Sequence, residues 1–151
     1  MSTDIIFVLL IFLIIFLIIL FTRKGKTFLR LTATFFPNKY IRIILFSLGG
    51  VSIGHKPNIP FGTYLSSKVS LGNNVKIGRG VTIGSNSIIG DNVVIESNVI
   101  ISRATIGNGT HIHRNAVIYG NKSNSLSIGE SCFIGYSALL DGTNKIEIGN
   151  F

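Results

Sequence analysis

The chain of 151 residues contains few cysteine, proline and charged residues. Its single cysteine, Cys132, excludes an internal disulfide, and a lone thiol suits a reducing compartment. Tryptophan is absent, there are only 3 prolines, and charged residues amount to 13%. The sequence also lacks a phosphate-binding loop and a dinucleotide-binding fingerprint, so it offers no nucleotide-binding motif.

Acidic residues are scarce as well, and their scarcity is uneven. Lys and Arg number 14 against 6 Asp and Glu, which leaves a formal charge of +8. Half of the basic residues fall between Arg23 and Lys56, a stretch without any acidic residue. Because this basic cluster directly follows an apolar run, we expect membrane lipid headgroups to be its partner and expect no nucleic-acid partner.

The apolar run, Ile5–Phe21, consists only of Ile, Leu, Phe and Val. As a helix it would measure about 25 Å, close to the ~30 Å hydrocarbon core of a bilayer. We therefore predict a transmembrane helix, with its basic flank, over residues 1–26. Basic residues follow the run and none precedes it. The positive-inside rule then predicts a single-pass protein of the inner (cytoplasmic) membrane, with everything after residue 22 facing the cytoplasm.

Residues 27–48 mix apolar and basic side chains and are interrupted by Pro37-Asn38. Pro37 has no backbone N–H and ends or kinks a helix, so the pattern predicts two short amphipathic helices. One interpretation lays both helices in the membrane interface, with Arg30, Lys39 and Arg42 among the lipid headgroups. The alternative is that they cap the first coil of the domain that follows and hide its open edge.

An internal repeat of six residues dominates the rest of the chain, residues 49–151. Neither an α-helix nor a flat strand repeats at six, whereas a short strand followed by a corner does. The repeat therefore predicts an all-β fold, a parallel β-helix, in which one aliphatic side chain per face points into a narrow prism. The aliphatic positions are Ile53, Ile59, Leu65, Leu71, Ile77, Ile83, Ile89, Ile95, Ile101, Ile106, Ile112, Ile118, Ile128, Ile134 and Leu140.

Two insertions, residues 119–127 and 141–145, interrupt the period. Insertions in a solenoid emerge on one face, which is often the binding face. Tolerated surface loops would give the same pattern, so both readings stay open. Between the insertions, Cys132 takes the small inward position four residues after Ile128, where we expect it to act as an apolar filler.

The stretch from Leu126 to Gly149, with its Ile-Gly pairs, resembles the hexapeptide-repeat acyltransferases and most closely their sugar O-acetyltransferase branch, the maltose and galactoside acetyltransferases. The resemblance to the wider family covers residues 49–151. It implies a left-handed parallel β-helix that assembles as a homotrimer. It also implies transfer of an acetyl group from acetyl-coenzyme A, without a metal ion, to a sugar hydroxyl. With the predicted anchor, the acceptor would be a membrane-associated glycan or glycan precursor of the capsule or O-antigen type.

The resemblance further implies a histidine that acts as general base, a role that suits an imidazole because its pKa lies near neutral pH. In the family this histidine lies about one coil beyond the motif that matches Ile148-Gly149, which is past Phe151. We therefore expect the chain to be a fragment or a truncated reading frame without its general base. If the chain ends at Phe151, the alternative is a non-catalytic, membrane-tethered β-helix scaffold or a truncated remnant.

Two histidines within the sequence are nevertheless candidate catalytic residues. His111 and His113 flank the inward Ile112, so alternation turns both outward, just before the first insertion. Ser137 and Asp141 lie in the stretch that the resemblance associates with the acceptor sugar, and they are the candidate substrate-binding residues.

The remaining histidine, His55, is expected to be a solvated corner residue of the first coil. A zinc enzyme of the γ-carbonic anhydrase kind needs three histidines in a particular arrangement. The spacing of His55, His111 and His113 does not fit that arrangement, and the sequence shows no other cluster of ligands. We therefore expect no metal site.

Overall fold

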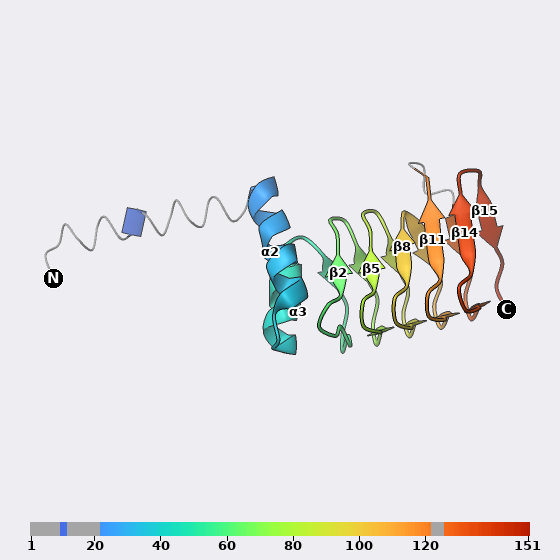
Figure 1. Ribbon diagram of the computed structural model, residues 1–151, viewed down its shortest axis with the longest axis horizontal. Helices are drawn as coiled ribbons and strands as arrows, with labels where there is room; N and C mark the ends of the chain where they lie inside the picture. The colour runs from blue at the N-terminus through green and yellow to red at the C-terminus, as the bar shows by residue number, and fades with distance from the viewer. Residues whose placement is uncertain (1–9, 12–21, 122–125) are drawn as a thin grey trace, which may run out of the picture.

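A prism of three parallel β-sheets is the dominant feature of the computed structural model, which describes residues 10–11, 22–121 and 126–151 (Figure 1). Each complete coil of the chain lays one strand in each sheet and then rises to the next level, whereas the first coil contributes only a single bridge, Asn58 to Lys76, to the second sheet. Every strand pairs with its equivalents in the neighbouring coils, and all pairs are parallel. The parallel β-helix predicted from the six-residue repeat is thus confirmed, while its left-handed winding stays an expectation of the resemblance.

The strands of each sheet follow one another along the prism. Sheet A contains β1 (Ser52–Ile53), β3 (Ser70–Leu71), β6 (Ile88–Ile89), β9 (Ala104–Ile106), β12 (Leu126–Ile128) and β15 (Ile146–Ile148). Sheet B contains β4 (Lys76–Ile77), β7 (Val94–Ile95), β10 (His111–Ile112) and β13 (Phe133–Ile134). Sheet C contains β2 (Tyr64–Leu65), β5 (Thr82–Ile83), β8 (Ile100–Ser102), β11 (Val117–Gly120) and β14 (Leu139–Gly142).

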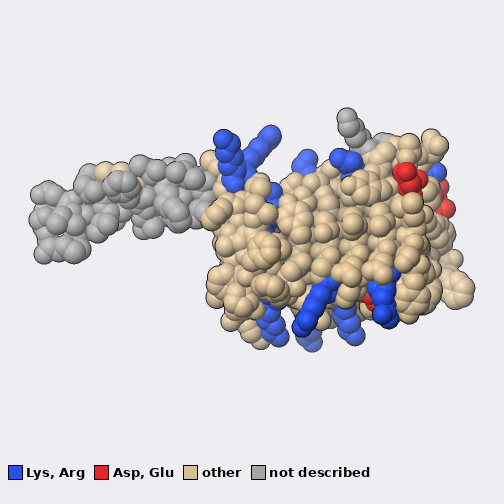
Figure 2. Space-filling view, viewed as in Figure 1, with Lys and Arg blue, Asp and Glu red and all other residues tan. Residues whose placement is uncertain are grey.

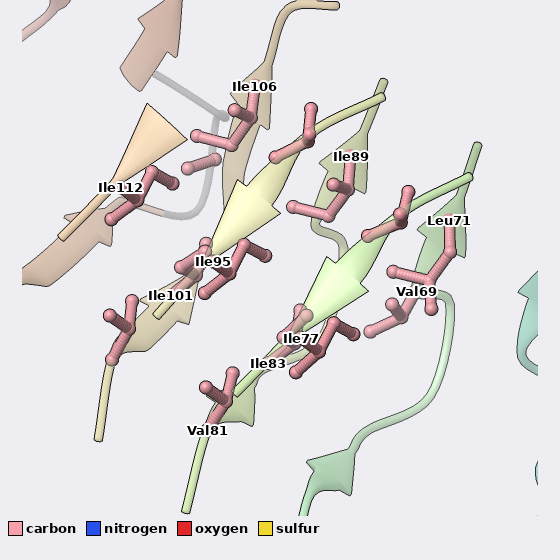
Figure 3. Close-up of a cluster of buried hydrophobic side chains, with 14 of the residues drawn as sticks. Val69, Leu71, Ile77, Val81, Ile83, Ile89, Ile95, Ile101, Ile106 and Ile112 are labelled. Carbon is pink, nitrogen blue, oxygen red and sulfur yellow. The ribbon is translucent and has the colours of Figure 1, made fainter. Parts of the chain in front are cut away.

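The interior of the prism is a column of aliphatic side chains (Figure 3). In sheet A, Leu71 pairs in register with Ile53 on one side and with Ile89 on the other, so equivalent side chains stack on each other. The smaller residues four positions later are buried as well, and Cys132 fills such a position with 6% of its surface exposed, as predicted. Because each coil covers only its neighbours, stability adds up coil by coil.

Polar side chains hold the corner between sheets A and B. The Asn73 backbone N–H donates to Asp91 Oδ1 at 2.6 Å, and the Asp91 N–H donates in turn to Asn108 Oδ1 at 2.8 Å. The Asn108 amide donates to Glu130 Oε1, and the Glu130 N–H donates to Asn150 Oδ1. Each side chain thus binds a group of the neighbouring coil. We call this edge the asparagine corner, residues 54–57, 72–75, 90–93, 107–110 and 129–132.

Two helices, α2 (Arg23–Phe35) and α3 (Lys39–Leu48), pack against each other and against the first coil (Figure 1). Pro37 lies between them, where the sequence predicts the break. Asn38 begins α3, because its side chain accepts the backbone N–H groups of Tyr40 and Ile41. The domain boundaries expected at residues 26 and 48 stay predictions.

Two arginines of these helices face the protein interior. Arg30 donates to the Gly49 carbonyl at 2.5 Å, and Arg42 Nη2 donates to the Ile59 carbonyl at 2.6 Å. The two side chains are only 6% and 3% exposed. Desolvation lowers the pKa of Arg42, because burial disfavours its charged form. These bonds fix the helix pair to the β-helix, so neither arginine is free to reach lipid headgroups.

The predicted membrane anchor has to be corrected. Ile5–Phe21 lies outside the described residues, apart from Leu10 and Ile11. Within the described part of the chain, none of the helices is long and apolar enough to cross a bilayer. The 13 residues of α2 and the 10 residues of α3 correspond to roughly 20 Å and 15 Å of helix, against a hydrocarbon core of ~30 Å. The predictions of a transmembrane helix and of a single-pass inner-membrane location are therefore wrong.

Candidate functional site

The corner between sheets B and C brings an acidic side chain and two imidazoles together. Glu96 directly follows β7, and His113 directly follows β10, the next strand of sheet B. The Glu96 N–H donates to the Ile112 carbonyl at 2.9 Å, which stacks the two corner residues one coil apart. His111 lies on the outer face of β10, paired with Val94 of β7. We call this edge the histidine corner, residues 78–81, 96–99, 113–116 and 135–138.

One carboxylate oxygen of Glu96 faces both imidazoles. Its Oε1 lies 3.2 Å from His111 Nε2 and 3.0 Å from His113 Nδ1. The other oxygen, Oε2, accepts the backbone N–H of Arg114 at 3.1 Å, and the Arg114 guanidinium lies 3.7 Å from it. Because Oε2 is held by the backbone, Oε1 is kept pointing at the two rings.

His113 is buried, although the alternation around Ile112 turns it away from the core. Only 7% of its surface is exposed. The Phe133 ring lies 4.4 Å and the Tyr136 ring 4.2 Å from the imidazole, and the His111 ring stacks on it at 4.5 Å (centroid distances). The expectation of an outward side chain holds for the half-exposed His111, whereas aromatic side chains of the next coil cover His113.

Both ring nitrogens of His113 are buried and lack a hydrogen-bond partner among the described residues. Nδ1 is close to Glu96 Oε1, but the two atoms are not aligned for a hydrogen bond. A buried polar group without a partner costs about 1–3 kcal/mol, so such groups are uncommon in folded proteins. The cluster therefore contains two ring nitrogens, those of His113, whose hydrogen-bonding ability the described fold does not use.

The carboxyl group of Glu96 is biased toward its ionised form. Desolvation raises its pKa, but the Arg114 N–H and the contacts with His113 and His111 together outweigh this effect. The pKa of Glu96 consequently lies below the usual value of 4.5. At neutral pH a carboxylate thus faces the two imidazoles.

An open groove of about 410 Å³ adjoins the cluster. Glu96 forms part of its wall, and the basic residues Lys76 and Arg114 line it as well. Lys and Arg side chains stand along both the upper and the lower edge of the molecule in Figure 2, whereas acidic side chains gather toward the C-terminal end of the β-helix. The groove therefore places two cations in the same wall as the Glu96 carboxylate that faces the imidazoles.

The structure brings only some of the predicted site residues together. His111 and His113 share one cluster, and the exposed Ser137 lies on the same corner, one coil further along. Asp141 lies in β14, roughly 13 Å along the chain from Ser137, and its Oδ1 accepts the N–H and hydroxyl of Thr143. The backbone N–H of His55 donates to Asn73 at the asparagine corner, away from the cluster.

Glu96 was not predicted from the sequence, because only residues close together along the chain were considered as a cluster. The relevant signal is the length of one coil, which places Glu96 of one coil beside His113 of the next. Aligning the sequence coil by coil brings the two residues to equivalent corner positions. The covering aromatic residues Phe133 and Tyr136 belong to the following coil and become recognisable in the same way.

A comparison with models of protein families identifies the chain. The model described as GMPPB C-terminal domain matches residues 64–144, more than half of the sequence. The chain belongs to this family. The GMPPB C-terminal domain match runs from β2 to just beyond β14, and so includes Glu96, both imidazoles of the cluster, Ser137 and Asp141.

Comparison with individual proteins adds little to this family assignment. No curated protein matches the chain. Among solved structures, a Bacillus cereus protein described as a "putative acetyltransferase" is 19% identical, over 67% of this chain and 75% of that protein. Its TM-score of 0.28 is too low for the match to bear on the function of this GMPPB C-terminal domain protein.

Proposed function

We propose that the chain is an acyltransferase that moves an acetyl group from acetyl-coenzyme A to a sugar hydroxyl. The observation that carries the proposal is the Glu96 carboxylate in contact with two imidazoles beside a basic groove. The six-residue repeat, which resembles that of the hexapeptide-repeat acyltransferases, supports the same reaction class. An imidazole held by a carboxylate is a suitable general base at neutral pH.

In this proposal His111 is the general base, because its side chain is 36% exposed whereas His113 is covered. His111 removes the proton of the acceptor hydroxyl while the hydroxyl oxygen attacks the thioester carbonyl carbon. The carbon–sulfur bond then breaks, and the imidazolium returns its proton to the departing thiolate. Glu96 orients His111 through Nε2 and stabilises the imidazolium, while His113 helps to position the carboxylate.

The basic groove is the proposed site of the acyl donor. Coenzyme A carries phosphates, and the Lys76 and Arg114 side chains supply cations in the wall of the groove that Glu96 shares. Of the two candidate acceptor residues, Ser137 lies on the same corner and Asp141 does not. We therefore include Ser137 in the proposed acceptor site and assign Asp141 no part in the transfer.

We also propose that the molecule assembles as a homotrimer through sheet C. The outward side chains of this sheet form a ladder, in register across neighbouring strands, that is mostly apolar. Ile100 is 39% exposed and Leu139 is 70% exposed. Exposed apolar ladders of this kind are typical of protein interfaces. Light scattering of the purified chain measures the assembly, and a monomeric mass would contradict this part of the proposal.

The experiment is a thiol-release assay with acetyl-coenzyme A and a panel of sugars, on the wild type and on His111→Ala. Loss of a general base reduces the rate by about 10²–10⁴-fold. We expect His55→Ala to leave the rate unchanged, because this histidine lies at the asparagine corner. Equal rates in the wild type and His111→Ala would contradict the assigned base. Failure of millimolar acetyl-coenzyme A to bind would contradict the reaction and favour the scaffold alternative.

A further inference from the structure

The three side chains at the histidine corner also have the arrangement of a metal site. The nearest nitrogens of His111 and His113 and a carboxylate oxygen of Glu96 all lie within 4.8 Å of one another. Two imidazoles and one carboxylate are a ligand set that zinc and other divalent first-row transition metals accept in proteins. We propose that Glu96, His111 and His113 bind one such ion.

The distances fit an ion of this class. A tetrahedral zinc site has metal–ligand bonds of ~2.0–2.2 Å, which sets neighbouring ligand atoms about 3.3 Å apart. Glu96 Oε1 lies 3.2 Å from His111 Nε2 and 3.0 Å from His113 Nδ1. Because the two rings are stacked at an interplanar angle of 20°, binding an ion between the three groups requires the imidazoles to rotate so that their nitrogens converge.

His113 provides an independent reason to expect a ligand. It is 7% exposed, and both of its ring nitrogens lack a hydrogen-bond partner in the described part of the chain. Its Nδ1 lies 3.0 Å from Glu96 Oε1 without forming a hydrogen bond. A metal ion would supply the missing partner for this nitrogen.

The surroundings resemble the outer shell of a metal site. Ligating carboxylates usually have their second oxygen held by a hydrogen bond, and here the Arg114 N–H holds Oε2 of Glu96. Phe133 and Tyr136 cover the buried imidazole and keep water from one side of the cluster. His111 and Glu96 are partly exposed, so the remaining coordination positions open toward solvent and can hold water or a ligand oxygen.

The ion and the proposed base would use the same imidazole. A metal bound to His111 occupies the nitrogen that contacts Glu96 and fixes the ring as a ligand. Zinc should therefore inhibit acyl transfer, an effect that rests on the proposed function. Binding of the ion itself does not depend on that function, so a spectroscopic measurement separates the two.

The experiment titrates Zn²⁺ by calorimetry, and Co²⁺ by its visible absorption, into the full chain prepared without a histidine tag. We expect one ion per chain, displacement of Co²⁺ by Zn²⁺, and no competition from Mg²⁺, which prefers oxygen ligands. Glu96→Gln and His111→Ala should each weaken binding roughly 100-fold or more. His55→Ala is the matched control and should bind like the wild type.

Circular dichroism confirms that each variant is folded before its affinity is compared. Two variants at different positions, one replacing a carboxylate and one an imidazole, keep the test decisive if either of them fails to fold. Absence of saturable binding by the wild type would overturn the proposal, as would equal affinity of Glu96→Gln. Acyl transfer that proceeds unchanged in the presence of zinc, together with saturable Co²⁺ binding, would instead overturn His111 as the general base and leave the metal site standing.

Discussion

The asparagine corner and the histidine corner recur along the same prism but differ in how fully their polar side chains are hydrogen-bonded. At the asparagine corner, Asp91 and Asn108 bind backbone N–H groups of neighbouring coils. At the histidine corner, one oxygen of Glu96 faces two imidazoles, and neither nitrogen of His113 has a hydrogen-bond partner among the described residues. Glu96 also joins neighbouring coils through Oε2, which accepts the Arg114 N–H, but the two nitrogens of His113 make no such bond within the described part of the chain.

The two corners are similarly tight where a glycine begins them. A Cβ added at Gly72, at the start of the asparagine corner, would lie 2.6 Å from the backbone of Gly90 one coil away. At the equivalent position of the histidine corner, a Cβ added at Gly78 would lie 2.5 Å from the backbone of Ser97. The histidine corner nevertheless carries large side chains at this position in the next two coils, namely Glu96 and His113.

The largest effect should come from a side chain at the close approach of the asparagine corner. In Gly107→Ala the new Cβ would lie 2.4 Å from the backbone of Gly129. We expect a loss of about 3 kcal/mol in the free energy of unfolding, measured with urea, because overpacking forces the coils apart. Gly135→Ala is the matched control, and it should change stability by less than ~0.5 kcal/mol. Similar losses in both variants would mean that the close approach of neighbouring coils is not the cause of the loss.

A smaller loss should follow from breaking the polar ladder. Asp91→Ala removes the acceptor of the Asn73 N–H, and we expect it to lower the free energy of unfolding by about 1–3 kcal/mol. Asp91→Asn keeps an oxygen at this position and should lose clearly less. Urea unfolding of the two variants side by side measures the difference. If both variants lose the same amount, the ladder contributes through charge rather than through its hydrogen bonds.

The β-helix could be predicted from the sequence because its inward aliphatic residues repeat at a constant spacing. Each inward aliphatic residue follows from the six-residue spacing, and Leu71 and Ile89 stack as that spacing requires. The candidate site was harder to predict, because Glu96 and His113 are one coil apart in the sequence and become neighbours only when the coils stack. The burial of His113 depends on Phe133 and Tyr136 of the next coil, which alternation along one strand does not reveal.

The helical end was predicted less well than the prism, for a different reason. Basic residues between apolar ones indicated lipid headgroups, yet Arg30 and Arg42 bind backbone carbonyls at the first coil. An amphipathic pattern reports which face of a helix is apolar, but not whether its arginines meet water, lipid or the end of a solenoid.

The smallest predicted effect concerns Ser137 at the histidine corner. This residue has a φ of 54°, and the equivalent positions of the preceding coils, Asn98 and Asn115, have positive φ as well. Asparagine tolerates the left-handed conformation better than serine does. Ser137→Asn should therefore raise the free energy of unfolding by about 0.5 kcal/mol. A decrease would indicate that the serine hydroxyl makes a contact of its own.

The most direct test of the account is the stability of His113→Phe. Phenylalanine keeps an aromatic ring against Phe133 and Tyr136 and removes two buried nitrogens that find no hydrogen-bond partner in the part of the chain that the structure describes. If the imidazole serves a ligand, urea unfolding will show a variant as stable as the wild type or more stable by about 1 kcal/mol. A loss as large as that of Asp91→Ala would show that His113 holds the fold, and would contradict a functional histidine corner.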